Sequence, residues 1–190
     1  MAEGEILGIL GPNGAGKTTT LQMLLGILTP TSGNISIFGK DIATHKSEIL
    51  ESVNFSSTYV DMPWRLSVKE NLTWSSWLYQ IPDRSRRLKQ VMELFRLEKL
   101  WNMPVASLSA GQKTRVNLAR SMVNYPRLLL LDEPTASLDP EVASYMREFF
   151  AKQRETFNKS IILTSHNMAE VEELCDRVLI LKDGLIFDID

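Results

Sequence analysis

A glycine-rich stretch near the N-terminus constrains the fold of this chain more than any other feature of its sequence. It lies between a short apolar run at residues 5–10 and a helical pattern over residues 16–28. Glycines allow the tight turn that such a junction needs, and a second apolar run at residues 34–38 follows. A strand, a glycine loop, a helix and a strand are the parts of a βαβ unit. The sequence therefore predicts an α/β fold with a parallel sheet.

The same stretch has the spacing of a phosphate-binding loop: glycine, any four residues, glycine, lysine, then serine or threonine. Its residues are Gly11, Pro12, Asn13, Gly14, Ala15, Gly16, Lys17 and Thr18, followed by Thr19. Inward-facing amides and the positive end of the helix favour an anion. Lys17 is expected to neutralise the β and γ phosphates of ATP, and the Thr18 hydroxyl to ligate magnesium. A chance glycine loop is the alternative, which the position between strand and helix disfavours.

Composition narrows the class of protein. The 190 residues suit one domain, and a net charge of −2 gives no general reason to expect nucleic acid or an anionic membrane as a ligand. A single cysteine, Cys175, cannot form an internal disulfide, which suits a reducing compartment. No apolar run is long enough to cross a bilayer, and the acidic start lacks the layout of a secretory signal. We therefore expect a cytoplasmic location.

A block of helices is predicted to interrupt the α/β alternation. Ser67 and Ser109 each begin a capping box, and residues 85–95 have helical spacing. We expect residues 67–125 to form a helical subdomain, inserted into an α/β core made of residues 1–66 and 126–190. Beyond it we expect strands at 128–131, 160–164 and 178–181, helices at 140–157 and 168–176, and a final hairpin strand at 186–189.

Two acidic residues follow the apolar run at 128–131. They would emerge at the carboxyl end of a buried strand, where ligands bind in open α/β sheets. Asp132 could hold magnesium through water, and Glu133 could polarise the water that attacks the γ phosphate. A solvated acidic turn is the alternative, but a phosphate loop in the same chain favours the functional interpretation.

Four motifs together resemble the nucleotide-binding subunit of ATP-binding-cassette (ABC) transporters. They are GPNGAGKTT at 11–19, LSAGQ at 108–112, LLLLDEP at 128–134 and TSH at 164–166. The resemblance covers nearly the whole chain, 1–190, and implies a P-loop NTPase fold, with ATP and Mg²⁺ as ligands and hydrolysis coupled to transport. It also implies two partners, a second nucleotide-binding subunit paired head to tail and a separate membrane-spanning subunit. The chain would then lie on the inner face of the cell membrane, and no nucleic acid is expected.

The resemblance assigns a second anion site to a helix tip. Free amides and the helix dipole at the tip would be offered to the ATP of the partner chain, although a plain capped helix is the alternative. The residues are Ser109, Ala110, Gly111 and Gln112. Ala110 replaces a glycine that is usual in the family, which a helical backbone tolerates.

Two further positions take a role from the resemblance. The segment 137–140 resembles the connection between the two sites of a dimer, with Asp139 in contact with nucleotide. An ordinary helix start, with Asp139 as N-cap and Pro140 at the first helical position, is the alternative. His166 falls where the family has its γ-phosphate sensor, although a lone histidine is more often structural. His45, placed in a polar loop, receives no role.

The sequence departs from the family in two places. No glutamine follows the strand before the helical block, where one usually senses magnesium and the γ phosphate; Ser56, Ser57 and Thr58 are the candidates to replace it. The antiparallel strands and the adenine-stacking aromatic that relatives carry before the phosphate loop are largely missing. Either the sequence is truncated, or other contacts hold adenine. The run at 35–38 would then be less covered.

Three functions compete at this point. The first is the ATP-hydrolysing engine of a transporter, which would dock on its membrane subunit near residues 61–66. Four aromatics suit such a surface or, equally well, the core of the helical block: Trp64, Trp74, Trp77 and Tyr79. The second is a cytosolic ATPase acting on ribosomes or DNA, although the chain lacks the second cassette and the extensions of such relatives. The third is a regulatory nucleotide binder that hardly hydrolyses.

Overall fold

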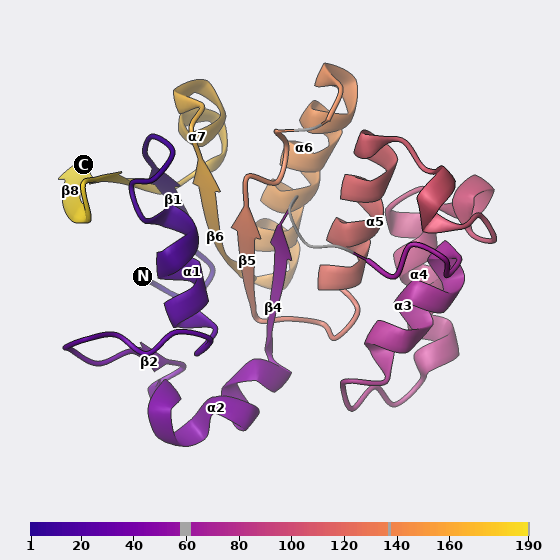
Figure 1. Ribbon diagram of the computed structural model, residues 1–190, viewed down its shortest axis with the longest axis horizontal. Coiled ribbons are helices and arrows are strands. Elements are labelled where there is room, and N and C mark those ends of the chain that lie inside the picture. Colours follow the sequence, from indigo (N-terminus) through magenta and orange to yellow (C-terminus); the bar gives the residue numbers. More distant parts are fainter. Residues whose placement is uncertain (58–61, 137, 190) are drawn as a thin grey trace.

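A six-stranded sheet forms the centre of the protein (Figure 1). The computed structural model describes residues 1–57, 62–136 and 138–189. The strand order is β4-β5-β6-β1-β7-β8, and β7 pairs antiparallel with β8 while the other pairs are parallel. The strands are β1 Ile6–Leu10, β4 Val53–Ser57, β5 Leu128–Asp132, β6 Ser160–Ser165, β7 Arg177–Lys182 and β8 Leu185–Ile189. The predicted α/β fold, with its parallel core and final hairpin, is confirmed.

Helices cover both faces of this sheet. They are α1 Lys17–Leu24, α2 Ile42–Glu51, α3 Val68–Ser76, α4 Arg84–Leu94, α5 Ala110–Ser121, α6 Pro140–Phe157 and α7 Met168–Leu174. Alternate residues of one strand serve the two faces, as strand geometry requires. Leu128 and Leu130 of β5 pack in the cluster that α1 and α2 share, whereas Leu129 and Leu131 pack in the cluster of α3 to α7. No helix in the described part of the chain combines the length and apolar character that a bilayer span requires.

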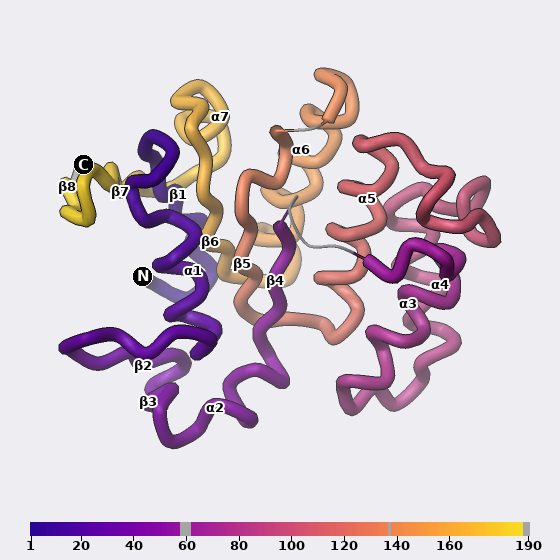
Figure 2. The backbone as a smooth tube through the Cα atoms, viewed as in Figure 1, coloured from indigo at the N-terminus to yellow at the C-terminus, as the bar shows by residue number. Residues whose placement is uncertain are grey.

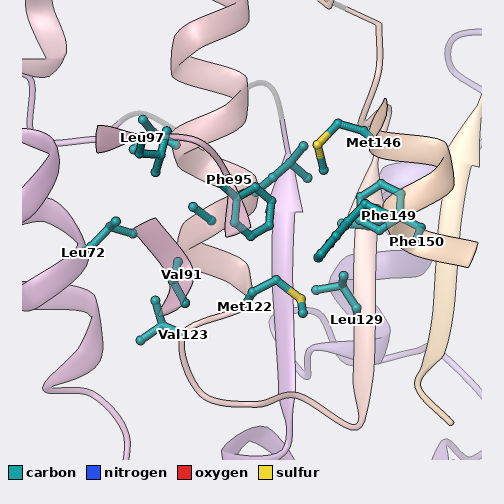
Figure 3. Packing of buried hydrophobic residues seen from close by; sticks show 14 of the residues in the cluster. Leu72, Val91, Phe95, Leu97, Met122, Val123, Leu129, Met146, Phe149 and Phe150 are labelled. Carbon is teal, nitrogen blue, oxygen red and sulfur yellow. The ribbon is translucent and has the colours of Figure 1, made fainter. Parts of the chain in front are cut away.

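The helical block contains α3, α4 and α5. Both predicted capping boxes are present, at Ser67 with Glu70 and at Ser109 with Gln112. Figure 1 shows α5 between the sheet and the pair α3 and α4, and α5 contacts β4 as well as both of these helices. Figure 3 shows that the apolar packing is continuous from Leu72 and Val91 to Leu129 of the sheet. The block therefore shares a hydrophobic core with the sheet, so a movement of the block would alter the packing against the sheet.

The strand predicted at residues 34–38 is present only in part, and its expected place in the parallel sheet is wrong. Ser36–Ile37 (β2) pairs with Lys40–Asp41 (β3) in a separate two-stranded antiparallel sheet. Phe38 and Gly39 both have positive φ, so the chain reverses before a longer strand can form. Figure 2 follows the chain from α1 through this hairpin and α2 to β4. The expectation that this segment would be poorly covered also fails for Ile37, which is buried.

Helix α2 was missed. Asp41 caps it by accepting a bond from the Ala43 amide at 2.8 Å. His45 therefore lies in a helix, not in a polar loop, at a position where the helical φ and ψ angles are interrupted. A short, kinked helix with polar residues gives a weak periodic signal, which explains the omission.

Candidate nucleotide-binding site

Three loops meet at the carboxyl end of the sheet. β5, β6 and β1 are adjacent strands, and their loops carry the predicted acidic pair, the predicted histidine and the phosphate loop in turn. The register places Asp132 beside Thr164 and Leu10 beside Ser165. Adjacent parallel strands thus bring together residues that are distant in sequence, such as Leu10 and Ser165.

The phosphate loop has the backbone that an anion site needs. A Cβ atom on Gly11 would lie 2.3 Å from the Leu181 carbonyl oxygen, so only glycine fits there. Gly16 is the N-cap of α1 with a φ of 105°, and no side chain caps this helix. The first amides of α1 are therefore left for a ligand. A pocket of about 180 Å³ opens at this point. Its lining residues are Pro12, Asn13, Gly14, Gly16, Lys17, Thr18, Thr19, Asp132 and Glu133.

Lys17 is buried at the base of this pocket and faces Glu133. Its Nζ atom donates to the Gly11 carbonyl at 2.6 Å and to the Pro12 carbonyl at 3.3 Å. The same Nζ lies 3.5 Å from Glu133 Oε1, and the two side chains are 7% and 11% exposed. The ammonium group is thus held over the loop, within reach of an anion and of the carboxylate.

Asp132 accepts bonds from the hydroxyls of three different elements. Its side chain accepts from Thr18 at 2.9 Å, from Thr164 at 2.6 Å and from Ser57 at 3.4 Å. The predicted magnesium pair, Thr18 and Asp132, therefore lies together. No group of three or more His, Cys, Asp or Glu in residues 1–57, 62–136 and 138–189 could hold a metal ion. One hydroxyl and one carboxylate still fit Mg²⁺, because this ion takes few protein oxygens and fills its shell with phosphate and water.

Glu133 follows in a different backbone conformation. Its φ of 52° is in the left-handed region, which directs its side chain away from that of Asp132. The Glu133 amide donates to both the carbonyl and the hydroxyl of Thr164, at 3.2 and 3.1 Å. His166 Nδ1 lies 2.8 Å from Glu133 Oε2, although 61% of the histidine side chain is exposed. The structure thus brings together all three residues predicted to be catalytic: Lys17, Glu133 and His166.

The second predicted anion site lies apart from this pocket. None of Ser109, Ala110, Gly111 and Gln112 is among the residues that line it. The Ser109 hydroxyl accepts from the Gln112 amide at 3.3 Å, and Gln112 Oε1 accepts from the Ser109 amide at 2.9 Å. Ala110 is the first residue of helix α5, so its methyl group meets no backbone restriction. Seen alone, this tip is a capped helix with an exposed end.

The segment at 137–140 differs in one respect from the expected helix start. Pro140 is the first helical residue and Asp139 is the N-cap of α6, as expected. The Asp139 side chain, however, makes no capping hydrogen bond. Its exposed carboxylate is therefore not committed to the helix. Ser137 lies outside the described residues.

Ser57 occupies part of the place where the family has its glutamine. Ser57 ends β4 opposite Asp132, and its hydroxyl reaches that carboxylate, whereas Ser56 points to the other face of the sheet. Asn117 of α5 donates to the Ser57 carbonyl. Ser57 thus links the helical block to the carboxylate of the magnesium pair. Thr58 lies outside the described residues.

Sequence reasoning missed Ser165 and Glu170. Ser165 Oγ donates to Glu170 Oε2 at 2.7 Å, and both residues are buried. Glu170 lies within the predicted helix at 168–176. Its position four residues after His166, on a short helix that packs on the sheet, was the available signal. Cys175, also nearby, remains a protonated thiol because burial raises its pKa to about 12.

The loop, the lysine and the paired carboxylates at the ends of parallel strands are the features of the P-loop NTPase fold. The sequence profile of the family described as "ABC transporter" matches residues 1–136. The chain belongs to this family, which confirms the resemblance drawn from the four motifs.

Similar proteins agree with this assignment. The bacitracin transport ATP-binding protein BcrA of Bacillus licheniformis is 38% identical over 98% of this chain and 60% of its own length. Nod factor export ATP-binding protein I of Neorhizobium galegae is 37% identical over 95% of this chain and 52% of its own. Among solved structures, cbiO1 of Clostridium perfringens, part of the ABC transporter complex cbiONQ, superimposes with a TM-score of 0.83. It is 30% identical and is matched over 98% of this chain and 77% of its own. The chain spans only 60% and 52% of the lengths of the bacitracin and Nod factor proteins.

Proposed function

We propose that this chain binds ATP with magnesium and hydrolyses it, and that the energy drives transport through a separate membrane-spanning subunit. One observation carries the proposal: Lys17, Thr18, Asp132 and Glu133 line a single pocket at the carboxyl end of the sheet. Relatives named for bacitracin transport and for Nod factor export support the coupling to transport.

Phosphate binding would change the partner of Lys17. The amides at the start of α1 donate to the phosphate oxygens. The Lys17 ammonium exchanges its contact with Glu133 for the β and γ phosphates, whose charge it neutralises. Thr18 and Asp132 would hold the magnesium ion, directly and through water respectively. When bound, the ion neutralises charge that develops on the phosphates.

Glu133 then becomes free to act on water. A carboxylate 3.5 Å from the lysine lies beside the position of the terminal phosphate and can orient and polarise the attacking water. His166, in contact with the other oxygen of Glu133, would hold the carboxylate and contact the γ phosphate. These roles make Glu133 the general base and His166 its partner.

A second copy of a nucleotide-binding subunit would complete the site. The pocket at Lys17 is open, and the exposed tip at Ser109–Gln112 lies elsewhere on the same chain. Two chains arranged head to tail would bring one tip to each pocket, with the uncommitted Asp139 near the junction. The exposed amides of the tip would contact the γ phosphate across this dimer.

A groove beside the helical block is the proposed contact for the membrane subunit. A cavity of about 380 Å³ lies between the end of α1, α2, β4 and the end of α3. It is lined by Leu25, Ile27, Lys46, Leu50, Val53, Asn54, Phe55, Leu78 and Tyr79. Trp77, adjacent to Leu78 in sequence, is 64% exposed, and Ile27 and Leu78 are exposed as well. Large exposed apolar side chains around a groove favour a protein partner. Docking here would place the chain on the inner face of the membrane.

The four aromatic residues predicted to dock differ in their exposure. Trp64, Trp74 and Trp77 are exposed, which favours the docking interpretation for them over the core interpretation. Tyr79 packs against the buried core and lines the groove at the same time. Asp61 lies outside the described residues. With residues 67–125 as the inserted subdomain and 1–66 and 126–190 as the core, the groove would lie where the two parts meet.

The substitution Glu133→Gln tests the proposal. Removal of the general base should lower ATP turnover by about 10²- to 10⁴-fold. ATP affinity should stay the same or rise, because Lys17 loses its competing carboxylate. Turnover and equilibrium binding of the wild type and the variant measure both effects. Glu155→Gln, which changes an exposed carboxylate of α6, is the matched control and should change neither. Equal, low turnover of wild type and Glu133→Gln would instead support the regulatory nucleotide binder.

A further inference from the structure

A buried carboxylate lies behind the candidate catalytic pair. Glu170, in the first turn of α7, is 6% exposed. Its Oε1 accepts from the Thr135 hydroxyl and its Oε2 accepts from the Ser165 hydroxyl. A carboxylate is seldom buried unless its oxygens are paired, because desolvation of the charge is costly. Both oxygens of Glu170 are satisfied by neutral hydroxyl donors.

These two hydroxyls lie close in sequence to the two residues of the catalytic pair. Thr135 is two residues after Glu133, and Ser165 immediately precedes His166. Ser165 Oγ also accepts from the Asn167 amide at 3.0 Å, so the residues on both sides of His166 are fixed. Glu170 thus joins the loop after β5 to the end of β6 through one side chain.

The histidine needs such support. Its side chain is 61% exposed, so little packing restrains the ring, and its contact with Glu133 is 2.8 Å long. The backbone must therefore fix its position. The Glu133 amide bonds to Thr164 of β6, and Glu170 bonds to Thr135 and Ser165, so both connections hold the segment of Glu133 to that of His166. A displacement of about 1 Å at such a contact can lower a rate by about 100-fold.

We propose that Glu170 is a positioning residue that keeps His166 against Glu133 by tying their two loops together. It does not line the pocket at Lys17, and it acts only through the histidine. The role rests on the proposed function, since it concerns how the hydrolytic pair is held.

Two measurements separate this role from general support of the fold. The first is a double-mutant cycle of ATP turnover with Glu170→Ala and His166→Ala. If Glu170 acts only through His166, its substitution should have no further effect on turnover once the histidine has been removed. The second is the NMR signal of the histidine rings. The chain has only two histidines, and His45 in α2 is an internal reference.

We expect Glu170→Ala to lower turnover by about 10- to 100-fold in the wild-type background and by less than about twofold in the His166→Ala background. The ring signals of His166 should move while those of His45 stay. Glu170→Gln should recover most of the rate, because hydroxyls can accept from the new amide as well as donate to it. Glu172→Ala, an exposed carboxylate of the same helix, should change nothing.

An equal loss of turnover in both backgrounds, or unmoved His166 signals, would overturn the proposal. If Glu170→Ala does not fold, Ser165→Ala removes one of the two bonds with less disruption and should move the same signals. A wild type without turnover would refute the proposed function alone, since the ring signals report the position of His166 without any hydrolysis.

Discussion

The two helix tips with anion-binding motifs, those of α1 and α5, differ in how their amides are used. Gly16 is the N-cap of α1 and offers no side chain, so the amides of this tip are left open at a pocket with a buried lysine. Ser109 is the N-cap of α5 within a capping box, and this tip is exposed. The first tip lies at a pocket formed within one chain. The second tip is capped without a ligand, so only some of its backbone amides are free to bind an anion.

Two backbone amides at the α5 tip remain available to an anion. The capping box already occupies the Ser109 and Gln112 amides. The amides of Ala110 and Gly111, which a helix leaves without an internal partner, are still available. A phosphate that also took the Ser109 hydroxyl would have to replace a cap worth about 1 kcal/mol. This difference explains why nucleotide would bind first at α1 and why α5 would contact it second.

The largest effect should come from the α1 tip. Lys17→Ala removes the charge that faces the phosphates and leaves Glu133 without its cation. A hydrogen bond with a charged partner contributes about 1.5–3 kcal/mol, so ATP affinity should fall by roughly 10- to 100-fold. Titration calorimetry of the purified chain measures it. Lys113→Ala changes an exposed lysine near the other tip and should leave this affinity unaltered. An unchanged affinity of Lys17→Ala would remove the distinction between the tips.

A smaller effect should come from the α5 tip. Ser109→Ala should lower the free energy of unfolding by about 1 kcal/mol through loss of the cap, as measured in urea. The ATP affinity of the single chain should change less than about twofold, because this tip does not line the pocket.

The capping box of α3 provides a matched control. Ser67→Ala removes the same kind of cap and should cost a similar free energy of unfolding. Only Ser109→Ala, however, should weaken association driven by ATP. If both variants weakened association equally, the α5 tip would have no role beyond its own helix.

Local signals in the sequence predicted much of this molecule. The phosphate loop, the apolar run before Asp132 and both capping boxes are determined by neighbours in sequence, and each lies where it was expected. The helix at 140–157 is confirmed at both ends because Pro140 starts it and Asn158, with positive φ, ends it.

Features that depend on distant contacts were not predicted. Residues 34–38 have the composition of a sheet strand, but their partner is the adjacent segment at 40–41. The sequence offers Ser57 only as one of three candidates for the missing glutamine, and its contact with Asp132 on the neighbouring strand selects it. The contacts of Glu170 with Thr135 and Ser165 were not predicted. A sequence shows that Glu170 is polar, but it does not show that the fold places it behind Glu133 and His166.

The pocket at Lys17 in one copy should be closed by the Ser109 tip of another copy. Sedimentation of the Glu133→Gln variant with and without Mg-ATP measures this association while ATP stays intact. We expect a monomer without nucleotide, a dimer with two bound ATP molecules, and loss of most of that dimer when Ser109→Ala is added. A chain that binds ATP with normal affinity and remains monomeric at every concentration of nucleotide would refute closure of the pocket by a second copy.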